Sequence, residues 1–171
     1  GQNIKYDLGV LSRYGVRVAP YDDTMLLSYV IDSGLHGHGM DELSELHLGH
    51  TPMTFKEVCG TGQKQISFGE VDLQKATEYA AEDADVTLRL WEILKPAIPG
   101  KGKLTLYETL ERPMPQILTD MELAGVKVDK AQLSRLSSDF AQKMAEHEDT
   151  AHELVGTKFN LGSPKQLGEI L

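Results

Sequence analysis

Apolar residues recur at intervals of three and four along most of the chain, which is the spacing of one face of an α-helix. The longest such stripe runs from Leu73 to Leu94, after Asp72 as a suitable cap, and Pro96 favours its end. The same spacing predicts four shorter helices, over residues 3–14, from Asp22 or Asp23 to 31, over 41–48 and over 55–58. It also predicts a helix over 104–124, with a break or kink at Pro113 and Pro115, and a helix over 129–155 with Asp129 as its cap. A last helix is predicted to begin at Ser163 and Pro164.

Short alternating stretches and glycine-rich stretches separate these helices. Residues 16–18 and 125–128 alternate in polarity and predict two short strands. Residues 49–69 predict a loop around one short helix, and a long loop inside a domain is often functional. The turn residues from Pro99 to Gly102 predict a domain boundary, with one domain over 1–102 and a second over 103–171. The chain is therefore expected to be mainly α-helical with a few short strands.

The composition narrows the classes of function. The 171 residues carry a formal net charge of −9, which argues against broad electrostatic attraction to nucleic acid. The charge is compatible with a metal-dependent phosphodiesterase, because such an enzyme needs carboxylates and its cations supply the local positive charge. Cys59 is the single cysteine, so an internal disulfide is excluded, and no apolar stretch has the length of a membrane helix.

Two pairs of side chains, each four positions apart, carry the candidate chemistry. Asn3 and Asp7 form the first pair, and Tyr79 and Asp83 form the second. On a helix each pair shares one face, and carboxylate, amide and phenol oxygens suit a divalent cation and an ordered water. Each pair also has a structural interpretation, because Asn commonly caps a helix start and Tyr and Asp commonly lie on a solvated helix face.

The histidines and glycines of the middle segment have simpler interpretations. The spacings of His36, His38, His47 and His50 match no compact zinc motif, and no cysteine partner accompanies them. The segment from Gly60 to Lys64 is too short for a phosphate-binding loop. Structural or surface roles are therefore favoured for both.

Separate blocks of the sequence, in a fixed order, resemble one known family. Residues 1–7 (GQNIKYD) and 79–91 (YAAEDADVTLRLW) resemble the second and third exonuclease motifs of bacterial family A DNA polymerases, the DNA polymerase I family, whose proofreading nucleases are of the DEDDy class. Residues 110–118, 121–129 and 159–171 resemble the start of that family's polymerase domain. The resemblance implies an α/β parent, with a ribonuclease H-like 3′–5′ exonuclease domain followed by the helical start of the polymerase domain.

The resemblance implies three catalytic residues by position. Asp83 matches a direct metal ligand, Asp7 matches the acid that holds the second metal largely through water, and Tyr79 matches the tyrosine that orients the attacking water. The implied cofactors of the parent are two divalent cations, Mg²⁺ or Mn²⁺. The implied reaction is two-metal hydrolysis of the 3′-terminal phosphodiester, which releases a nucleoside monophosphate.

The resemblance also implies a binding site for a single-stranded 3′ end. Asn3 matches a residue that lines this site, with Gln2, Lys5 and Tyr6 beside it, and Phe55 matches an aromatic residue that packs against the terminal nucleotides. The implied partners of the parent are DNA, as a single-stranded 3′ end and as primer–template, and nucleotides. The implied location is the bacterial cytoplasm, in association with the nucleoid and without a membrane.

Two departures from the family pattern change what is expected of this chain. The first exonuclease motif, Asp-x-Glu on a strand, would lie before Gly1, so we expect the chain to be an excised fragment. Because that motif supplies two further metal carboxylates, we expect the chain alone to be inactive and to bind the cations incompletely. Because the strands that carry it should form most of the central sheet, we expect exposed apolar faces and self-association of the chain. Gly37 precedes His38 where family members have Arg, which puts one phosphate contact in question.

Two other functions fit the same residues. A structural or DNA-guiding platform would keep the fold without hydrolysis. A ribonuclease D-like 3′–5′ exoribonuclease would share the DEDDy residues, but the polymerase-like stretch after residue 104 argues against it. Metal-dependent cleavage of single-stranded DNA, and a preference for DNA over RNA, distinguish these functions.

Overall fold

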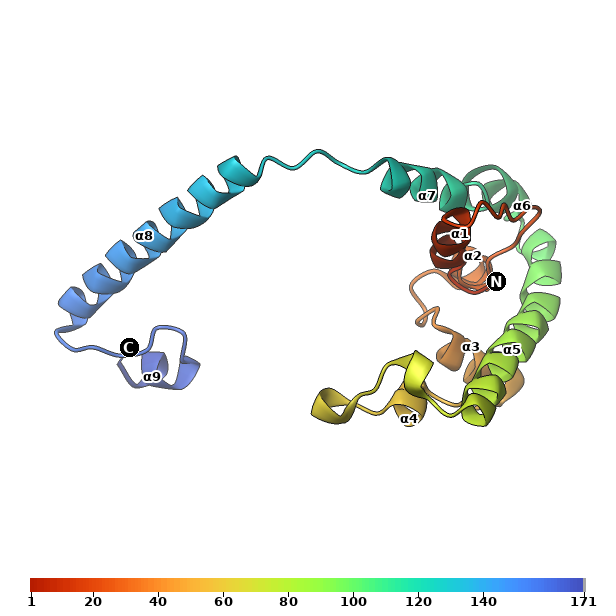
Figure 1. The fold of residues 1–171 in the computed structure, drawn as a ribbon, viewed down its shortest axis with the longest axis horizontal. Helices are drawn as coiled ribbons and strands as arrows, with labels where there is room; N and C mark the ends of the chain where they lie inside the picture. Colours follow the sequence, from red (N-terminus) through yellow and green to blue (C-terminus); the bar gives the residue numbers. More distant parts are fainter. Residues whose placement is uncertain (171) are drawn as a thin grey trace. The chain divides into compact units, whose positions relative to one another are not determined.

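The computed structural model describes residues 1–170, and all regular structure within that range is helical (Figure 1). The chain divides into two compact units, Gly1–Gly125 and the residues from Val126 onward. The elements of the first unit are α1 (Ile4–Ser12), α2 (Thr24–Asp32), α3 (Met40–Leu48), α4 (Phe55–Cys59), η1 (Gly62–Lys64), η2 (Phe68–Glu70), α5 (Leu73–Gly100), α6 (Leu104–Leu106), η3 (Tyr107–Glu111) and α7 (Met114–Ala124). The elements of the second unit are α8 (Lys130–Val155) and α9 (Pro164–Ile170).

The expectation of a mainly helical chain is confirmed, but the prediction of two short strands is wrong for the described residues. Residues 16–18 and 125–128 are irregular, and Val16, Val126 and Val128 are exposed. A strand needs a neighbour for its backbone hydrogen bonds, and alternation of polarity alone does not provide one. These stretches therefore serve as connections between helices.

The long helix α5 continues beyond the end that the sequence predicts. Pro96 was expected to end it, yet the helix runs through Pro96 and Pro99 to Gly100. Proline removes one backbone donor, but Leu94 and Ile98 on either side are fully buried against the core. Burial of two large side chains contributes about 2 kcal/mol each, which is enough to offset the lost hydrogen bond. The turn follows at Gly102, whose φ of 68° suits glycine.

The core of the first unit lies where α2 and α3 pack on α5. Asp23 caps α2 by accepting a hydrogen bond from the Met25 backbone N–H at 3.0 Å, and Asp72 caps α5 in the same way. The helices then present apolar stripes to one another. The buried core consists of Leu27, Val30, Ile31, Leu43, Val86, Leu90, Leu94, Ile98 and Tyr107.

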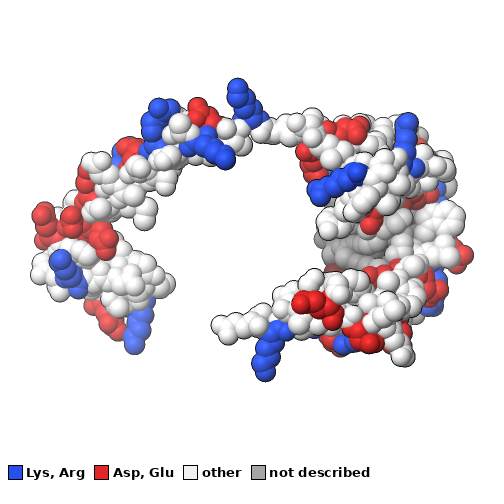
Figure 2. Space-filling model, viewed as in Figure 1, with Lys and Arg blue, Asp and Glu red and all other residues white. Residues whose placement is uncertain are grey.

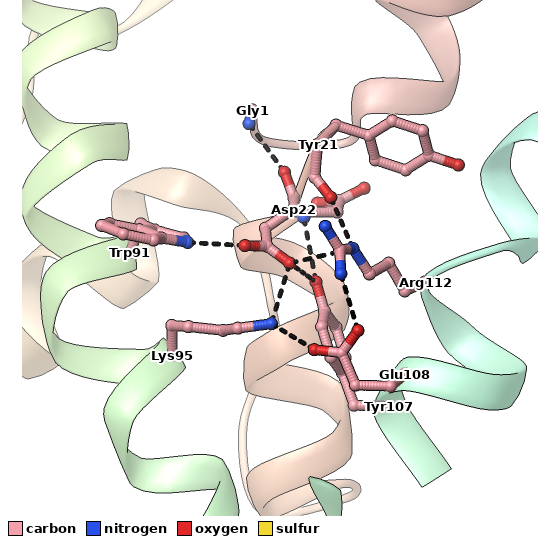
Figure 3. A network of polar contacts seen from close by, with 9 residues as sticks. Gly1, Tyr21, Asp22, Trp91, Lys95, Tyr107, Glu108 and Arg112 are labelled. Atoms are coloured by element: carbon pink, nitrogen blue, oxygen red, sulfur yellow. Dashed lines mark hydrogen bonds and ion pairs between the residues drawn. The ribbon is translucent and has the colours of Figure 1, made fainter. Parts of the chain in front are cut away.

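A polar network around Asp22 fastens η3 to α5 (Figure 3). The Asp22 carboxylate accepts hydrogen bonds from Trp91 Nε1 at 2.9 Å, Lys95 Nζ at 3.1 Å and the Tyr107 hydroxyl at 2.8 Å. Arg112 Nε lies 3.4 Å from the same carboxylate. Trp91 and Lys95 belong to α5. Tyr107 is the first residue of η3, and Arg112 directly follows η3, so the network joins segments far apart in the sequence.

Glu108 completes this network by bridging its two cations. Its carboxylate oxygens lie 2.6 Å from Lys95 Nζ and 2.6 Å from an Arg112 guanidinium nitrogen. The segment 104–124 is thereby held on the first unit, where α7 also packs on α1. The compact unit thus extends to Gly125, beyond the functional boundary expected at residue 102. The break expected near Pro113 is present, between η3 and α7.

The second unit consists of a long helix and a short one. Asp129 caps α8 by accepting a hydrogen bond from the Gln132 N–H at 2.9 Å, as the sequence predicts, and a His152 ring nitrogen lies 2.8 Å from the Phe159 carbonyl oxygen. Acidic side chains gather at the C-terminal end of α8 (Figure 2). Exposed apolar residues lie along one stretch of α8 at helical spacing, namely Leu133, Leu136, Phe140 and Met144.

Candidate active site

The N-terminal half of α5 carries one of the two candidate pairs. The cap at Asp72 fixes where the helix begins, since its carboxylate accepts a hydrogen bond from the Gln74 N–H at 3.0 Å. The helix then places Tyr79 and Asp83 on one face, as their spacing predicts. Ala80 and Ala84 beside them leave room for another segment to approach.

Asp83 and Asp7 line the same recess of about 500 Å³. Asp7 comes from α1 and Asp83 from α5, so the fold brings together two acids that lie far apart in the sequence. Gln2 lines the recess as well. The remaining lining residues are Gly1, Met40, Ala84 and Thr87.

Asp83 is held in an unfavourable electrostatic environment. One of its carboxylate oxygens, Oδ1, is buried and has no hydrogen-bond partner among the described residues. Burial raises the pKa of Asp83, a hydrogen bond from the Tyr79 hydroxyl lowers it in part, and the nearby carboxylates Asp41 and Glu82 raise it again, so that the pKa stays above its usual value. A buried carboxylate oxygen without a donor costs free energy, and a bound cation would remove that cost.

The acids of the recess fit a divalent cation, but they supply only part of a full ligand set. Oxygen ligands of this kind suit Mg²⁺ or Mn²⁺, and the free oxygen of Asp83 is available for one. Across residues 1–170, no group of three or more His, Cys, Asp or Glu side chains is arranged to hold a metal ion. Asp7 and Asp83 therefore form a pair of carboxylates that falls short of a three-ligand group within these residues.

Tyr79 lies one helical turn before Asp83 and keeps its proton. Burial and the charge of Asp83 raise the pKa of the Tyr79 hydroxyl to about 12. The phenol is therefore neutral at physiological pH and retains an O–H group that can donate to a water molecule or a phosphate oxygen.

An aromatic cluster surrounds Tyr79. The rings of Phe55 and Phe68 lie 6.4 Å and 5.8 Å from the Tyr79 ring, and they stack on each other at 6.2 Å. Phe55 and Phe68 remain partly exposed, so the cluster offers aromatic surface to a ligand. Sequence reasoning singled out Phe55 but missed Phe68, whose only signal is an aromatic residue within the long loop.

Gln2 lies in the recess, whereas Asn3 does not line it. The Gln2 amide donates to the His38 carbonyl oxygen at 2.9 Å and accepts from the Thr24 hydroxyl at 2.5 Å. Asn3 takes the N-cap position of α1 in the left-handed conformation, but its side chain makes no capping hydrogen bond. The Asp23 carboxylate caps that end, accepting from the Asn3 N–H at 2.9 Å and the Ile4 N–H at 3.0 Å.

Lys5 and Tyr6 are placed differently from Asp7. The Lys5 ammonium forms an ion pair with Glu122 on α7, and Asn3 and Lys5 line a separate recess. Tyr6 is 73% exposed. The structure thus brings Gln2, Asp7 and Asp83 into one recess and Phe55 next to Tyr79, and it does not bring Asn3 or Lys5 into that recess.

The remaining reactive side chains have structural surroundings. The His36 ring lies 5.1 Å from that of His38 and 6.5 Å from that of His47. Burial and the charge of His36 lower the pKa of both His38 and His47, which favours neutral rings. Cys59 is buried. In the part of the chain that the structure describes, no helix combines the length and the apolar character needed to cross a membrane.

Known proteins resemble this chain over nearly its whole length. It is 54% identical over 170 residues to DNA polymerase I of Rhizobium leguminosarum, and the matched region covers 99% of this chain and 17% of that protein. It is 42% identical over 178 residues to DNA polymerase I of Pseudomonas aeruginosa, with 100% of this chain and 19% of that protein covered. The chain therefore spans less than a fifth of these relatives.

A solved structure shares the fold. The polymerase domain of Pol1 from M. smegmatis, in complex with DNA primer-template and dNTP, superimposes with a TM-score of 0.76 at 24% identity. The match covers 99% of this chain and 26% of that one. At this identity the likeness concerns the fold alone.

The first part of the chain matches a defined family. Residues 1–99 match the sequence profile of a family described as 3′–5′ exonuclease. The matched range contains Asp7, Tyr79 and Asp83 and ends at the C-terminal end of α5. The match covers more than half of the chain, which therefore belongs to this 3′–5′ exonuclease family.

Proposed function

We propose that the chain carries the second and third acidic motifs of a proofreading 3′–5′ exonuclease within a bacterial DNA polymerase I. The observation that carries this proposal is that Asp83, whose Oδ1 is buried and has no described partner, lines the same recess as Asp7. The similarity to DNA polymerase I over nearly the whole chain supports it. The parent would act in the cytoplasm on DNA.

Each residue of the site has a role in this proposal. Asp83 and Asp7 would hold two divalent cations, Mg²⁺ or Mn²⁺, which supply Lewis-acid stabilisation and an activated water when bound. Tyr79, which keeps its proton at neutral pH, would orient that water by hydrogen bonding. Gln2 would contact the DNA strand from the recess, and Phe55 would pack against a terminal base.

Asn3, Lys5 and Tyr6 would act farther along the bound strand. Tyr6 is exposed, and Asn3 and Lys5 face a second recess next to α7. The ammonium of Lys5 would reach a phosphate by exchanging its surface ion pair with Glu122, which costs little because such pairs are weak.

The domain organisation is part of the same proposal. Residues 1–102 would form the C-terminal part of a ribonuclease H-like exonuclease domain, and residues 103–171 would begin the polymerase domain. The exonuclease family match to residues 1–99 supports the first assignment, and the fold shared with a polymerase–DNA complex supports the second. Primer–template DNA and nucleotides would then be partners of the parent.

A structural or DNA-guiding role is the second candidate for the chain by itself. Within residues 1–170, no set of three metal-binding side chains is present, so Asp7 and Asp83 alone would not assemble a two-metal site. We therefore propose that the isolated chain does not hydrolyse DNA and that activity requires the Asp-x-Glu motif of the parent.

Degradation of a 3′-labelled single-stranded DNA oligonucleotide with Mg²⁺ or Mn²⁺ tests this proposal. The full-length parent should degrade it, whereas the chain alone and the parent carrying Asp83→Ala should not. A matched RNA oligonucleotide tests the ribonuclease alternative. No cleavage by a folded, DNA-binding parent would contradict the exonuclease proposal and favour the platform.

A further inference from the structure

Glu82, the neighbour of Asp83, connects α5 to the segment that leads into α4. One of its carboxylate oxygens lies 2.8 Å from His50 Nε2, and the other accepts a hydrogen bond from the Met53 backbone N–H at 2.7 Å. These two hydrogen bonds lower the pKa of Glu82, the bond from Met53 being the larger cause. Both carboxylate oxygens of Glu82 are thus engaged by these partners, and Glu82 does not line the recess that Asp83 lines.

Two further hydrogen bonds fix the chain on either side of Met53 to neighbouring helices. The His50 carbonyl oxygen accepts a hydrogen bond from the Ser44 hydroxyl of α3 at 2.7 Å. Lys75 of α5 donates to the Glu57 carbonyl oxygen of α4 at 2.6 Å. The segment before α4 is therefore anchored to α3 through His50 and to α5 through Glu82, and α4 itself is anchored to α5 through Lys75.

Phe55, the first residue of α4, depends on this anchoring. Thr54 and Glu57 form a capping box, with the Thr54 N–H donating to the Glu57 carboxylate at 2.7 Å, so the start of α4 is locally rigid. The Met53 amide held by Glu82 lies two residues before Phe55. A shift at Met53 would therefore carry the Phe55 ring away from Tyr79.

We propose that Glu82 is a positioning residue that sets the place of Phe55 relative to Tyr79 and Asp83, and so the place of the terminal base. This inference rests on the exonuclease function proposed above. After burial and the charge of Asp41, the negative charge of Glu82 also raises the pKa of Asp83, so the placement of Glu82 is electrostatically unfavourable for its neighbour. The contacts to His50 and Met53 give this acid a structural reason to be there.

Kinetics of single-stranded DNA degradation by the full-length parent test this inference. Glu82→Ala should raise KM about tenfold and change kcat less than about threefold, because it disturbs a base-stacking contact and leaves the acids in place. Glu82→Gln, which keeps an acceptor for the Met53 N–H, should restore most of the loss. Glu92→Ala removes an exposed acid from the same helix and should behave like the parent.

A double-mutant cycle with Phe55→Ala identifies the route of the effect. If Glu82 acts through Phe55, then Glu82→Ala should change KM by less than about twofold in the Phe55→Ala background. A full tenfold effect in that background, or a loss of kcat at unchanged KM, would overturn the inference.

Hydrogen exchange of the chain tests the anchoring independently of catalysis. Glu82→Ala should accelerate exchange of the Met53 amide at least tenfold, while amides near Leu90 and Leu94 in the core stay protected. Unchanged exchange at Met53 would overturn the inference even in an active enzyme. If the parent shows no nuclease activity but Met53 exchange accelerates, the proposed function fails and the anchoring stands.

Discussion

Asp22 and Asp83 are both half-buried carboxylates in the first unit, but their surroundings are opposite. Asp22 accepts hydrogen bonds from Trp91, Lys95 and Tyr107. Burial alone would raise its pKa, yet these donors together hold the pKa of Asp22 below its usual range. Asp83 has a buried oxygen without a described partner, and its pKa is raised.

This difference separates a carboxylate that holds segments of the fold together from one that we propose binds a ligand. A buried charge with several donors stabilises a specific arrangement of segments, here η3 on α5. A carboxylate with a buried oxygen that lacks a donor persists only where the rest of the fold supports it, and such sites are commonly functional. The comparison predicts that the two residues respond to substitution in opposite ways.

The largest expected effect is on catalysis, at Asp83. Asp83→Asn in the full-length parent should reduce exonuclease turnover about a thousandfold, since several kcal/mol of metal-dependent stabilisation would be lost. Single-turnover degradation of single-stranded DNA measures this loss. Asp85→Asn, at an exposed position on the same helix, is the matched control and should stay within about threefold of the parent. Equal losses in both variants would contradict the assignment.

The next largest effect is on stability, at Asp22. Asp22→Asn should lower the free energy of unfolding by about 3 kcal/mol, because it leaves Lys95 and Arg112 sharing one carboxylate, that of Glu108. Urea unfolding of the chain, followed by circular dichroism, measures the change. Asp139→Asn, which breaks an exposed ion pair with Lys143 on α8, should cost less than about 1 kcal/mol.

A smaller effect is expected at Tyr107, which donates its hydroxyl to the same carboxylate. Tyr107→Phe keeps the buried ring and removes one hydrogen bond, so unfolding should become easier by about 1–2 kcal/mol. Tyr14→Phe, at a residue that is 79% exposed, is the control and should be neutral. If both substitutions are neutral, the network does not contribute to stability.

The smallest effect is a dependence of stability on pH. Because the pKa of Asp22 is lower in the folded state than in the unfolded chain, its ionised form stabilises the fold above the unfolded pKa of about 3.9. That stabilisation is lost as the pH falls through the lowered folded value. The difference in unfolding free energy between the unsubstituted chain and its Asp22→Asn variant should therefore shrink below about pH 4 and be constant near neutrality. A difference that grows in acid would contradict this.

The sequence predicts features that depend on local interactions. The caps at Asp23, Asp72 and Asp129 and the break near Pro113 follow from nearest neighbours along the chain. The continuation of α5 through Pro96 could not be predicted in this way, because it depends on Ile98 packing in the core.

The candidate site shows the same limit. The spacing of Tyr79 and Asp83 and a family resemblance indicated the chemistry of the site, but no pattern showed that Asp83 Oδ1 would lack a partner. The contacts of Glu82 with His50 and Met53 join positions about thirty residues apart, so only the fold reveals them. The network around Asp22 is hidden from the sequence for the same reason.

Side-by-side unfolding of Asp22→Asn and Asp83→Asn at neutral pH, in the chain without divalent cations, tests the central claim most directly. The predicted result is a loss of about 3 kcal/mol for Asp22→Asn and no loss, or a gain, for Asp83→Asn, since the neutral amide relieves the repulsion from Asp41 and Glu82. A loss for Asp83→Asn equal to that for Asp22→Asn would contradict the claim, because both carboxylates would then hold the fold.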